Sequence, residues 1–227
     1  MLAYFFSKAV FKIIRSPKIR WNLSKAFPAI FFSPRMTWDE YLLFKKICRS
    51  KKVFLEYGSG GSTIYLLRKN KKIFSVESNP EFYSYMNSIP LVKKSLNKNL
   101  SYGLVDLGPT NKWGKPLSKE NSDTWSDYYM NVWKSIDPVK DKVDVIFIDG
   151  RFRVCCCLYS LLKVVEYNWK DTVFIIHDFW RREKYHEVLE FLEEVKSSSN
   201  LASFKLKANL NVEQVIEKMP EYAFDFS

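Results

Sequence analysis

Glu56-Tyr57-Gly58-Ser59-Gly60-Gly61-Ser62 is the stretch that decides the fold, because it joins a short apolar strand to a helical pattern. Three of the seven glycines of the chain lie in it. Gly58 permits a tight turn, while Gly60 and Gly61 let a ligand approach the backbone. The helix that begins near Ser62 points its first amide groups at the same place. The stretch therefore predicts a ligand-binding loop at the carboxyl end of a strand.

Strand and helix patterns alternate on both sides of this loop. Apolar runs predict strands at 53–55, 72–76, 101–107, 143–148, 172–176 and 201–206, and helical patterns cover 37–48, 62–69, 154–166 and 183–192. The first of these helices begins with a capping box, Thr37 with Glu40 three residues later. Strands rich in Val, Ile and Phe without polar alternation are typical of a sheet buried on both faces. We therefore predict a Rossmann-like α/β fold, with a doubly wound, mostly parallel sheet flanked by helices and an N-terminal helical extension.

Glu77 is the second feature that indicates a nucleotide-like ligand. It ends the second predicted strand, 19 residues after Gly58. An acid about 20 residues beyond a glycine-rich loop meets ribose hydroxyls in nucleotide-binding α/β folds. A carboxylate has the two acceptor oxygens that a pair of hydroxyls needs.

The pattern Glu-x-Gly-x-Gly-Gly-Ser, followed by acids at the ends of the next two strands, resembles class I S-adenosylmethionine-dependent methyltransferases. The resemblance covers roughly residues 37–206, and Ser62 stands where the family often has a third glycine. Dinucleotide-binding proteins instead use G-x-G-x-x-G, without an acid two residues before the first glycine. The resemblance implies S-adenosylmethionine as the cofactor, with Glu56 near its methionine end, Glu77 at the ribose and Asp106 at the adenine amino group. The cofactor-binding residues that it implies are Glu56, Gly58, Ser59, Gly60, Gly61, Ser62, Glu77 and Asp106.

Asp149 ends the fourth predicted strand, at the sheet edge where open α/β folds bind ligands. In the methyltransferases this strand end faces the transferred methyl group, so the resemblance makes Asp149 the first catalytic candidate. Arg151 and Arg153 follow at once. Guanidinium groups there suit a carboxylate or phosphate on the substrate, or a structural ion pair.

His177 and Asp178 end the fifth predicted strand and complete the catalytic candidates. A neutral imidazole is a good general base for a hydroxyl, although His177 could instead hold the loop in place. Catechol-type O-methyltransferases bind a divalent metal through acids at these two strand ends and a following Asn. Asp149 and Asp178 match the acids, but Phe179 occupies the Asn position. We therefore expect no metal, and a mechanism with His177 or Asp149 as the base.

Residues 108–135 form a long insertion before the fourth strand. Long loops at this edge usually bind or cover substrate, and aromatic rings suit a sugar or a planar ring. Trp113 and Trp180 are therefore further substrate-binding candidates. Trp125 and Trp133 fit core packing equally well.

The N-terminus carries most of the positive charge. Seven basic residues and no acid precede Asp39, which leaves +4 of the formal net charge of +11 for the rest. Residues 3–15 have the pattern of a basic amphipathic helix, which suits peripheral contact of residues 1–20 with an anionic membrane. The same face could dock on the domain or on a second copy in a homo-oligomer. We divide the chain into residues 1–36, the helix and its connector, and residues 37–227, the methyltransferase domain.

The four cysteines lack zinc-ligand spacing, and the run at 155–157 fits small buried helix residues. No segment has the ~20 uninterrupted apolar residues of a membrane span, and the N-terminus makes a poor signal peptide. These observations favour a reducing, cytoplasmic location, with the inner face of a membrane as the place for the basic helix.

The leading hypothesis is a methyltransferase acting on a hydroxyl of a saccharide or another small molecule, in surface-glycan biosynthesis. An RNA methyltransferase is the first alternative, but the positive charge is concentrated outside the catalytic domain and no N/D-P-P-Y/F sequence ends the fourth strand. A non-catalytic binding or assembly module of the same fold is the second alternative.

Overall fold

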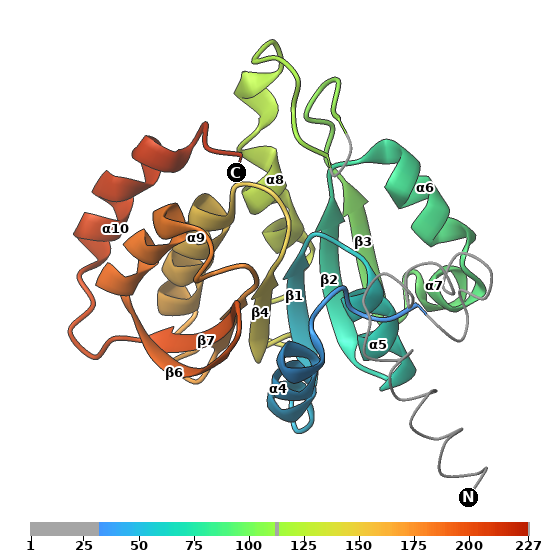
Figure 1. Ribbon diagram of the computed structural model, residues 1–227, viewed down its shortest axis with the longest axis horizontal. Helices are drawn as coiled ribbons and strands as arrows, with labels where there is room; N and C mark the ends of the chain where they lie inside the picture. Colours follow the sequence, from blue (N-terminus) through green and yellow to red (C-terminus); the bar gives the residue numbers. More distant parts are fainter. Residues whose placement is uncertain (1–31, 112–113, 227) are drawn as a thin grey trace, which may run out of the picture.

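Seven strands form one sheet in the computed structural model, which describes residues 32–111 and 114–226 (Figure 1). Their order is β3-β2-β1-β4-β5-β7-β6. The strands are β1 (Val53–Tyr57), β2 (Lys72–Glu77), β3 (Leu100–Leu104), β4 (Val145–Ile148), β5 (Val173–Ile176), β6 (Leu192–Ser198) and β7 (Leu201–Leu206). Neighbours from β3 to β5 are parallel, whereas β7 is antiparallel to both β5 and β6. The predicted Rossmann-like, mostly parallel sheet is confirmed.

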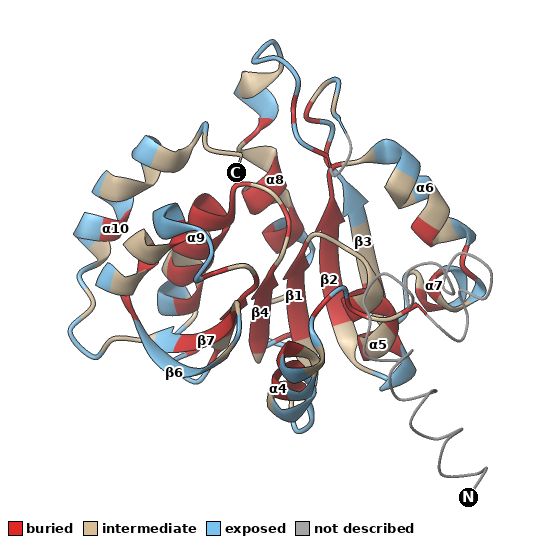
Figure 2. Ribbon diagram, viewed as in Figure 1, coloured by how far each residue is buried: buried red, intermediate tan, exposed pale blue. Residues whose placement is uncertain are grey.

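Helices cover both faces of the sheet, and the central strands β1, β2, β4 and β5 are buried between them (Figure 2). One face packs on α4 (Trp38–Cys48), α5 (Gly61–Arg68), α6 (Pro80–Ser88) and α7 (Pro90–Ser95). The other packs on α8 (Asp127–Met130), α9 (Arg153–Glu166) and α10 (Val212–Lys218), and on the 3-10 helices η2 (Asn131–Ser135) and η3 (Glu183–Glu190). Two further 3-10 turns are η1 (Ser122–Thr124) and η4 (Met219–Tyr222).

Successive residues of a strand serve opposite faces, as the pleat requires. Phe54 packs with the helices α4 to α7, whereas its neighbours Leu55 and Tyr57 pack with α9 and η2. Phe32 and Met36 are also buried in the first of these two clusters. Residues that we assigned to the N-terminal connector therefore contribute to the core. The predicted helix at 3–15 lies outside the described residues.

Local sequence signals explain where several helices begin. At the start of α4, the Glu40 carboxylate accepts a bond from the Thr37 amide at 2.7 Å, and Thr37 Oγ1 accepts one from the Glu40 amide. Asn79 caps α6 by accepting a bond from the Phe82 amide at 2.7 Å. The predicted capping box is confirmed.

Four differences from the sequence prediction concern the later elements. The third strand ends at Leu104 rather than at residue 107, and the helix predicted at 183–192 is the 3-10 helix η3. The pattern predicted neither β6 nor α10. The run at 155–157 is buried on α9, as predicted, and its cysteines are free. Among the described residues, no helix combines the length and apolar character that a bilayer crossing requires.

Candidate functional site

The loop after β1 is held close to the loop after β4. Gly58 has a φ of +88°, and its amide donates to the Val76 carbonyl at 2.9 Å. A Cβ at Gly58 would lie 2.7 Å from Gly150 Cα. Gly58 is therefore required both for the positive φ and for the contact between the two loops.

Gly60 and Gly61 differ in what surrounds them. A Cβ at Gly61 would lie 2.0 Å from the Ser33 carbonyl oxygen, so residues 32–34 occupy the space beside it. Nothing lies within 4 Å of the Cβ position of Gly60 among the residues that the structure describes. We predicted that both glycines admit a ligand. The structure corrects this for Gly61, because its own chain fills that space.

Glu56 fixes the position of the loop through hydrogen bonds to its carboxylate. Its side chain is fully buried, and Ser62 Oγ donates to Oε1 at 2.5 Å. Thr63 Oγ1 and Ser75 Oγ donate to Oε2 at 2.6 and 2.9 Å. Burial raises the pKa of Glu56 to about 7, although the three hydroxyl groups oppose this rise. Both carboxylate oxygens are therefore engaged by α5 and β2, which fixes the loop to the sheet.

Glu77 lies at the end of β2, beside Ser59 of the loop. Its Oε1 accepts bonds from the Ser78 and Asn79 amides at 2.8 and 3.0 Å, and its Oε2 accepts one from Ser59 Oγ at 3.0 Å. Ser59 Oγ is also 2.6 Å from Tyr102 Oη, a partner that sequence reasoning missed. Burial raises the pKa of Glu77, and the amide and hydroxyl donors oppose the rise. These bonds fix the orientation of the predicted ribose-binding acid and join it to the loop at Ser59.

Asp106 lies two residues beyond the end of β3, on an exposed loop. Its Oδ1 accepts a bond from the Gly108 amide at 2.9 Å. The carboxylate lies at a pocket of about 280 Å³ that is also lined by Asn121, Thr124, Asp127 and Asn131. The adenine role that the resemblance implies for Asp106 stays a prediction.

Asp149, at the end of β4, pairs with two cations through one oxygen. Its Oδ1 is 3.0 Å from His177 Nδ1 and 3.1 Å from an Nη atom of Arg153. Burial raises the pKa of Asp149, but the charges of His177 and Arg153 outweigh it and hold the pKa below its usual value. Its Oδ2 has no hydrogen-bond partner within the part of the chain that the structure describes.

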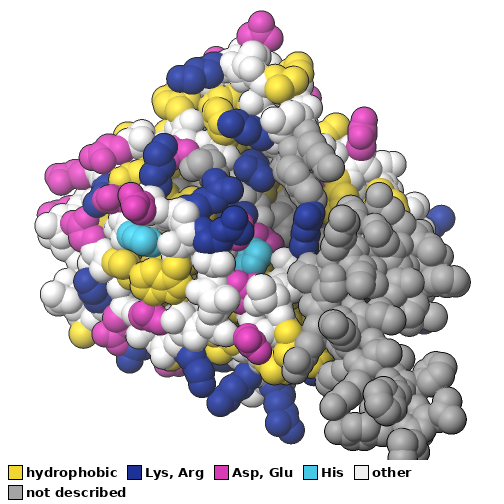
Figure 3. All heavy atoms as spheres, viewed as in Figure 1, with side chains coloured by type: hydrophobic (Ala, Val, Ile, Leu, Met, Phe, Trp, Pro, Cys, Tyr) yellow, Lys and Arg dark blue, Asp and Glu magenta, His cyan; other side chains and the backbone are white. Residues whose placement is uncertain are grey.

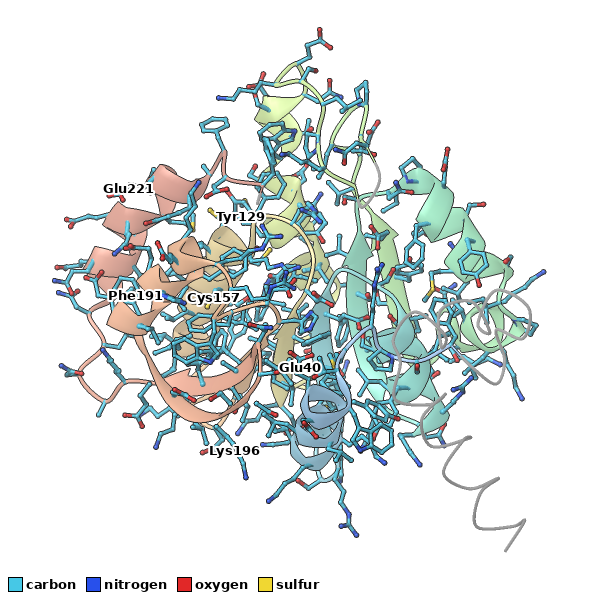
Figure 4. The ribbon with its side chains drawn as sticks, in the orientation of Figure 1. Glu40, Tyr129, Cys157, Phe191, Lys196 and Glu221 are labelled. Carbon is cyan, nitrogen blue, oxygen red and sulfur yellow. The ribbon has the colours of Figure 1, made fainter. Side chains whose placement is uncertain are left out.

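His177 lies between two carboxylates. Its second ring nitrogen, Nε2, is 3.6 Å from Oε2 of Glu40, which α4 carries (Figure 4). Burial lowers the pKa of His177, but Asp149 and Glu40 raise it to about 10. A general base has to be neutral, so this arrangement contradicts the neutral-base role that we predicted for His177. The imidazolium instead joins α4 to the ends of β4 and β5.

Glu40 is a residue of this cluster that sequence reasoning did not identify. Besides capping α4, it accepts a bond from the Asn200 amide, in the turn between β6 and β7, at 2.9 Å. Burial raises its pKa, but His177 and the backbone donors outweigh this and lower it to about 2. The only signal in the sequence was the capping box, which places Glu40 on α4 but says nothing of His177.

Arg153 is buried, and the protein itself satisfies its guanidinium. Nε donates to the Gly150 carbonyl at 3.0 Å, Nη1 to the His177 carbonyl at 2.5 Å and Nη2 to the Asp149 carbonyl at 3.2 Å. Of the two roles that the sequence left open for Arg153, these contacts support the structural ion pair. The guanidinium also lies 3.7 Å from Asp178, which has a φ of +58°.

Asp149, His177 and Asp178 place ligand atoms within 4.8 Å of one another, a spacing that could hold a metal ion. Arg153 already supplies a positive charge to both acids, at 3.1 and 3.7 Å. His177 would have to lose its proton to bind a metal. A metal-free site remains our prediction, and these contacts support it.

The other predicted substrate residues have different surroundings. Arg151 is half-buried and donates through Nη1 to the Phe226 carbonyl at 3.3 Å. Trp180 is 37% exposed and lies 5.3 Å from the ring of His186. Trp113 lies outside the described residues. Trp125 and Trp133 are buried, and Trp133 donates to Tyr57 Oη at 2.8 Å, so both belong to the core.

Comparisons with known protein families and with curated proteins find no match for this chain. Among solved structures, the chain is similar to a methyltransferase-like protein (SPO2022) from Silicibacter pomeroyi, with a TM-score of 0.66 and 24% identity over 86% of this chain and 98% of that one. A weaker likeness is to the MycE methyltransferase of the mycinamycin biosynthetic pathway in complex with Mg and SAH, with a TM-score of 0.44 and 10% identity over 82% of this chain and 53% of that one. The first likeness shows that the chain shares the Rossmann-like fold of that protein, and the second is too weak to carry an inference.

Proposed function

We propose that this protein is an S-adenosylmethionine-dependent methyltransferase. The observation that carries the proposal lies at the carboxyl end of β1: no described residue fills the Cβ position of Gly60, and the adjacent Ser59 donates to the buried carboxylate of Glu77. Ligands of open α/β folds bind at this edge of the sheet. Gly58, Ser59, Gly60 and Glu77 would hold the cofactor, and Glu56 would keep their loop in place. When bound, S-adenosylmethionine supplies an electrophilic methyl group on its sulfonium.

The acceptor atom that we propose is a hydroxyl oxygen. The Oδ1 atom of Asp149 is held by His177 and Arg153, which leaves Oδ2 to accept a hydrogen bond from the acceptor. A hydroxyl proton becomes acidic as its oxygen forms a bond to carbon. A carboxylate with a low pKa can therefore take the proton late in the reaction. In this mechanism Asp149 orients the oxygen, and much of the rate comes from positioning.

We further propose a saccharide or another small hydroxylated molecule as the acceptor, with surface-glycan biosynthesis as the process. The half-exposed ring of Trp180 beside the end of β5 supports this class, since an aromatic face can stack on a sugar ring. Of the tryptophans in and beyond the insertion that we considered for this role, Trp125 and Trp133 belong to the core and Trp113 lies outside the described residues, which leaves Trp180.

Binding of S-adenosylhomocysteine tests the proposal without knowledge of the acceptor. Ligand at 100-fold above its Kd should stabilise the protein by about 2.7 kcal/mol, measured as a rise in melting temperature. Glu77→Gln should abolish the rise. Glu81→Gln, the same change at an exposed position of α6, is the control and should leave the rise intact. A rise with a nicotinamide dinucleotide but not with S-adenosylhomocysteine would contradict the cofactor assignment.

A further inference from the structure

Two buried polar atoms next to the candidate site have no hydrogen-bond partner among the described residues. They are Tyr185 Oη, on η3, and Arg151 Nε, in the loop after β4. Tyr185 is 2% exposed. A buried donor without a hydrogen-bond partner costs free energy. Arg151 and Tyr185 also interact electrostatically, so their two unsatisfied atoms call for a common explanation.

The surroundings of Tyr185 are strongly basic. The guanidinium carbons of Arg153 and Arg182 lie 5.5 and 5.8 Å from the centre of its ring. Burial raises the pKa of Tyr185, while the charges of Arg153, Arg182 and Arg151 oppose this rise. The phenol therefore keeps its proton at neutral pH and remains a hydrogen-bond donor. Figure 3 shows Lys and Arg side chains gathered near the centre of this face.

Positive side chains outnumber the carboxylates that pair with them around Tyr185. Arg153 and Arg181 lie within 4.0 Å of Asp149 or Asp178, and His177 lies between Asp149 and Glu40. These three cations therefore match three acids. In the described ranges, no carboxylate lies at ion-pair distance from Arg151 or Arg182.

The charge of Arg151 is also repelled by neighbouring arginines. Burial lowers the pKa of Arg151, and the adjacent charges of Arg153 and Arg182 lower it further. Like charges that are gathered without a counter-charge are unfavourable, unless an anion joins them. Arg182 is exposed, so its side chain can move to admit an oxygen atom to Tyr185.

We propose that Arg151, Arg182 and Tyr185 bind a phosphate group of the methyl acceptor. This proposal rests on the proposed function, because Arg153 joins the subsite to Asp149: its guanidinium contacts both Asp149 and the Tyr185 ring. A phosphate monoester carries about two negative charges at pH 7, which matches the two guanidinium groups that have no carboxylate at ion-pair distance among the described residues. Its three oxygens can each accept from a different side chain, whereas a carboxylate pairs best with one planar guanidinium.

Calorimetric titration of the full chain with inorganic phosphate, at constant ionic strength, tests the subsite. We expect saturable binding with one phosphate per chain. Arg182→Gln should weaken it roughly tenfold or more, because it removes a charge-assisted hydrogen bond. Tyr185→Phe should weaken it roughly fivefold without lowering the melting temperature, because it removes only an unpaired hydroxyl. Lys93→Gln removes the same charge from exposed α7 and should change nothing.

Several results would overturn the proposal: no saturable binding, an equal loss in Lys93→Gln, or acetate bound as tightly as phosphate. S-adenosylhomocysteine binding, measured on the same samples, separates the two proposals, and Arg182→Gln and Tyr185→Phe should leave it unchanged. If the protein binds S-adenosylhomocysteine but not phosphate, the subsite proposal is overturned and the proposed function is not. If the protein binds phosphate but not S-adenosylhomocysteine, the proposed methyl transfer is overturned. The assignment of the phosphate to a methyl acceptor is then overturned with it.

Discussion

His177 faces Asp149 with Nδ1 and Glu40 with Nε2, at 3.0 and 3.6 Å. The two ring nitrogens of His177 therefore face acids that come from different elements. The three side chains form one electrostatically coupled unit. Asp149 keeps one oxygen outside this unit. The imidazolium and the carboxylate consequently have different tasks, since the first stabilises the site and the second can meet an acceptor.

Stability should depend on pH through this cluster. The pKa of His177 rises from 6.5 to about 10 on folding, so its contribution is complete below pH 6.5 and is lost as the pH rises through 10. The pKa of Glu40 falls from 4.5 to about 2, so its contribution is complete above pH 4.5 and is lost on acidification through 2. Urea unfolding at pH 5.5 and pH 9 should show that His177→Gln costs more free energy at pH 5.5. His186→Gln is the control for loss of an imidazole, and an equal cost for His177→Gln at both pH values would refute the charged assignment.

Turnover should separate the roles of Asp149 and His177. Asp149→Asn keeps the size of the side chain but removes the proton acceptor, so turnover should fall about 10²- to 10⁴-fold. His177→Gln removes one partner of Oδ1 and the contact with Glu40 but leaves Oδ2 of Asp149 in place, so the folded variant should retain most of the activity. The measurement is S-adenosylhomocysteine formation with a panel of saccharide phosphates. A larger loss in His177→Gln than in Asp149→Asn would restore His177 as the base.

At the scale of elements, the loop between β1 and α5 offers a matched pair of substitutions. Gly61→Ala places a methyl group against the Ser33 backbone, which should lower the free energy of unfolding by roughly 1–3 kcal/mol. Gly60→Ala meets nothing within 4 Å in the described structure, and its φ of 166° suits any residue. It should leave stability unchanged and weaken S-adenosylhomocysteine binding. Chemical denaturation and calorimetry measure the two effects, and an unchanged affinity in Gly60→Ala would place the cofactor elsewhere.

The elements that the sequence predicted well are those with a strong local signal. The buried parallel strands consist of apolar runs, and α4 and α6 begin at capping residues. In contrast, β6 is a polar edge strand in which Leu192 alone is fully buried, so it has no apolar pattern to detect. Its pairing with β7 uses backbone hydrogen bonds, which composition does not reveal.

Sequence patterns were limited in the same way for the candidate site: they located its residues but not their contacts. Strand ends placed Asp149, His177 and Glu77 correctly at one edge of the sheet. The partners that change their chemistry come from distant sequence: Glu40 meets His177 across 137 positions. The guanidinium of Arg153 donates mainly to backbone carbonyls. Every residue type has such a carbonyl, so the sequence does not reveal these bonds. Sequence reasoning therefore found the candidates but not the contacts on which we base the roles now proposed for His177 and Arg153.

At the scale of the whole molecule, the positive charge divides into two regions with different predicted ligands. Arg151 and Arg182 lie at the carboxyl edge of the sheet, beside the site. The other region is the N-terminus, where residues 1–20 contain five basic residues and no acid. The two regions should respond differently to salt and to truncation, because a surface that attracts anionic lipids is screened whereas a half-buried subsite is screened less.

Removal of residues 1–20 should release the protein from vesicles that contain anionic lipid and leave phosphate binding intact. Each basic residue near such a surface contributes about 1 kcal/mol, so the loss of five should abolish binding at physiological salt. Co-sedimentation of the full and shortened chains with anionic and neutral vesicles measures this, and the melting temperature provides the second readout. The core contacts of Phe32 and Met36 are kept in the shortened chain, so its melting temperature should be unchanged. A lower melting temperature with unaltered vesicle binding would show instead that the segment docks on the domain.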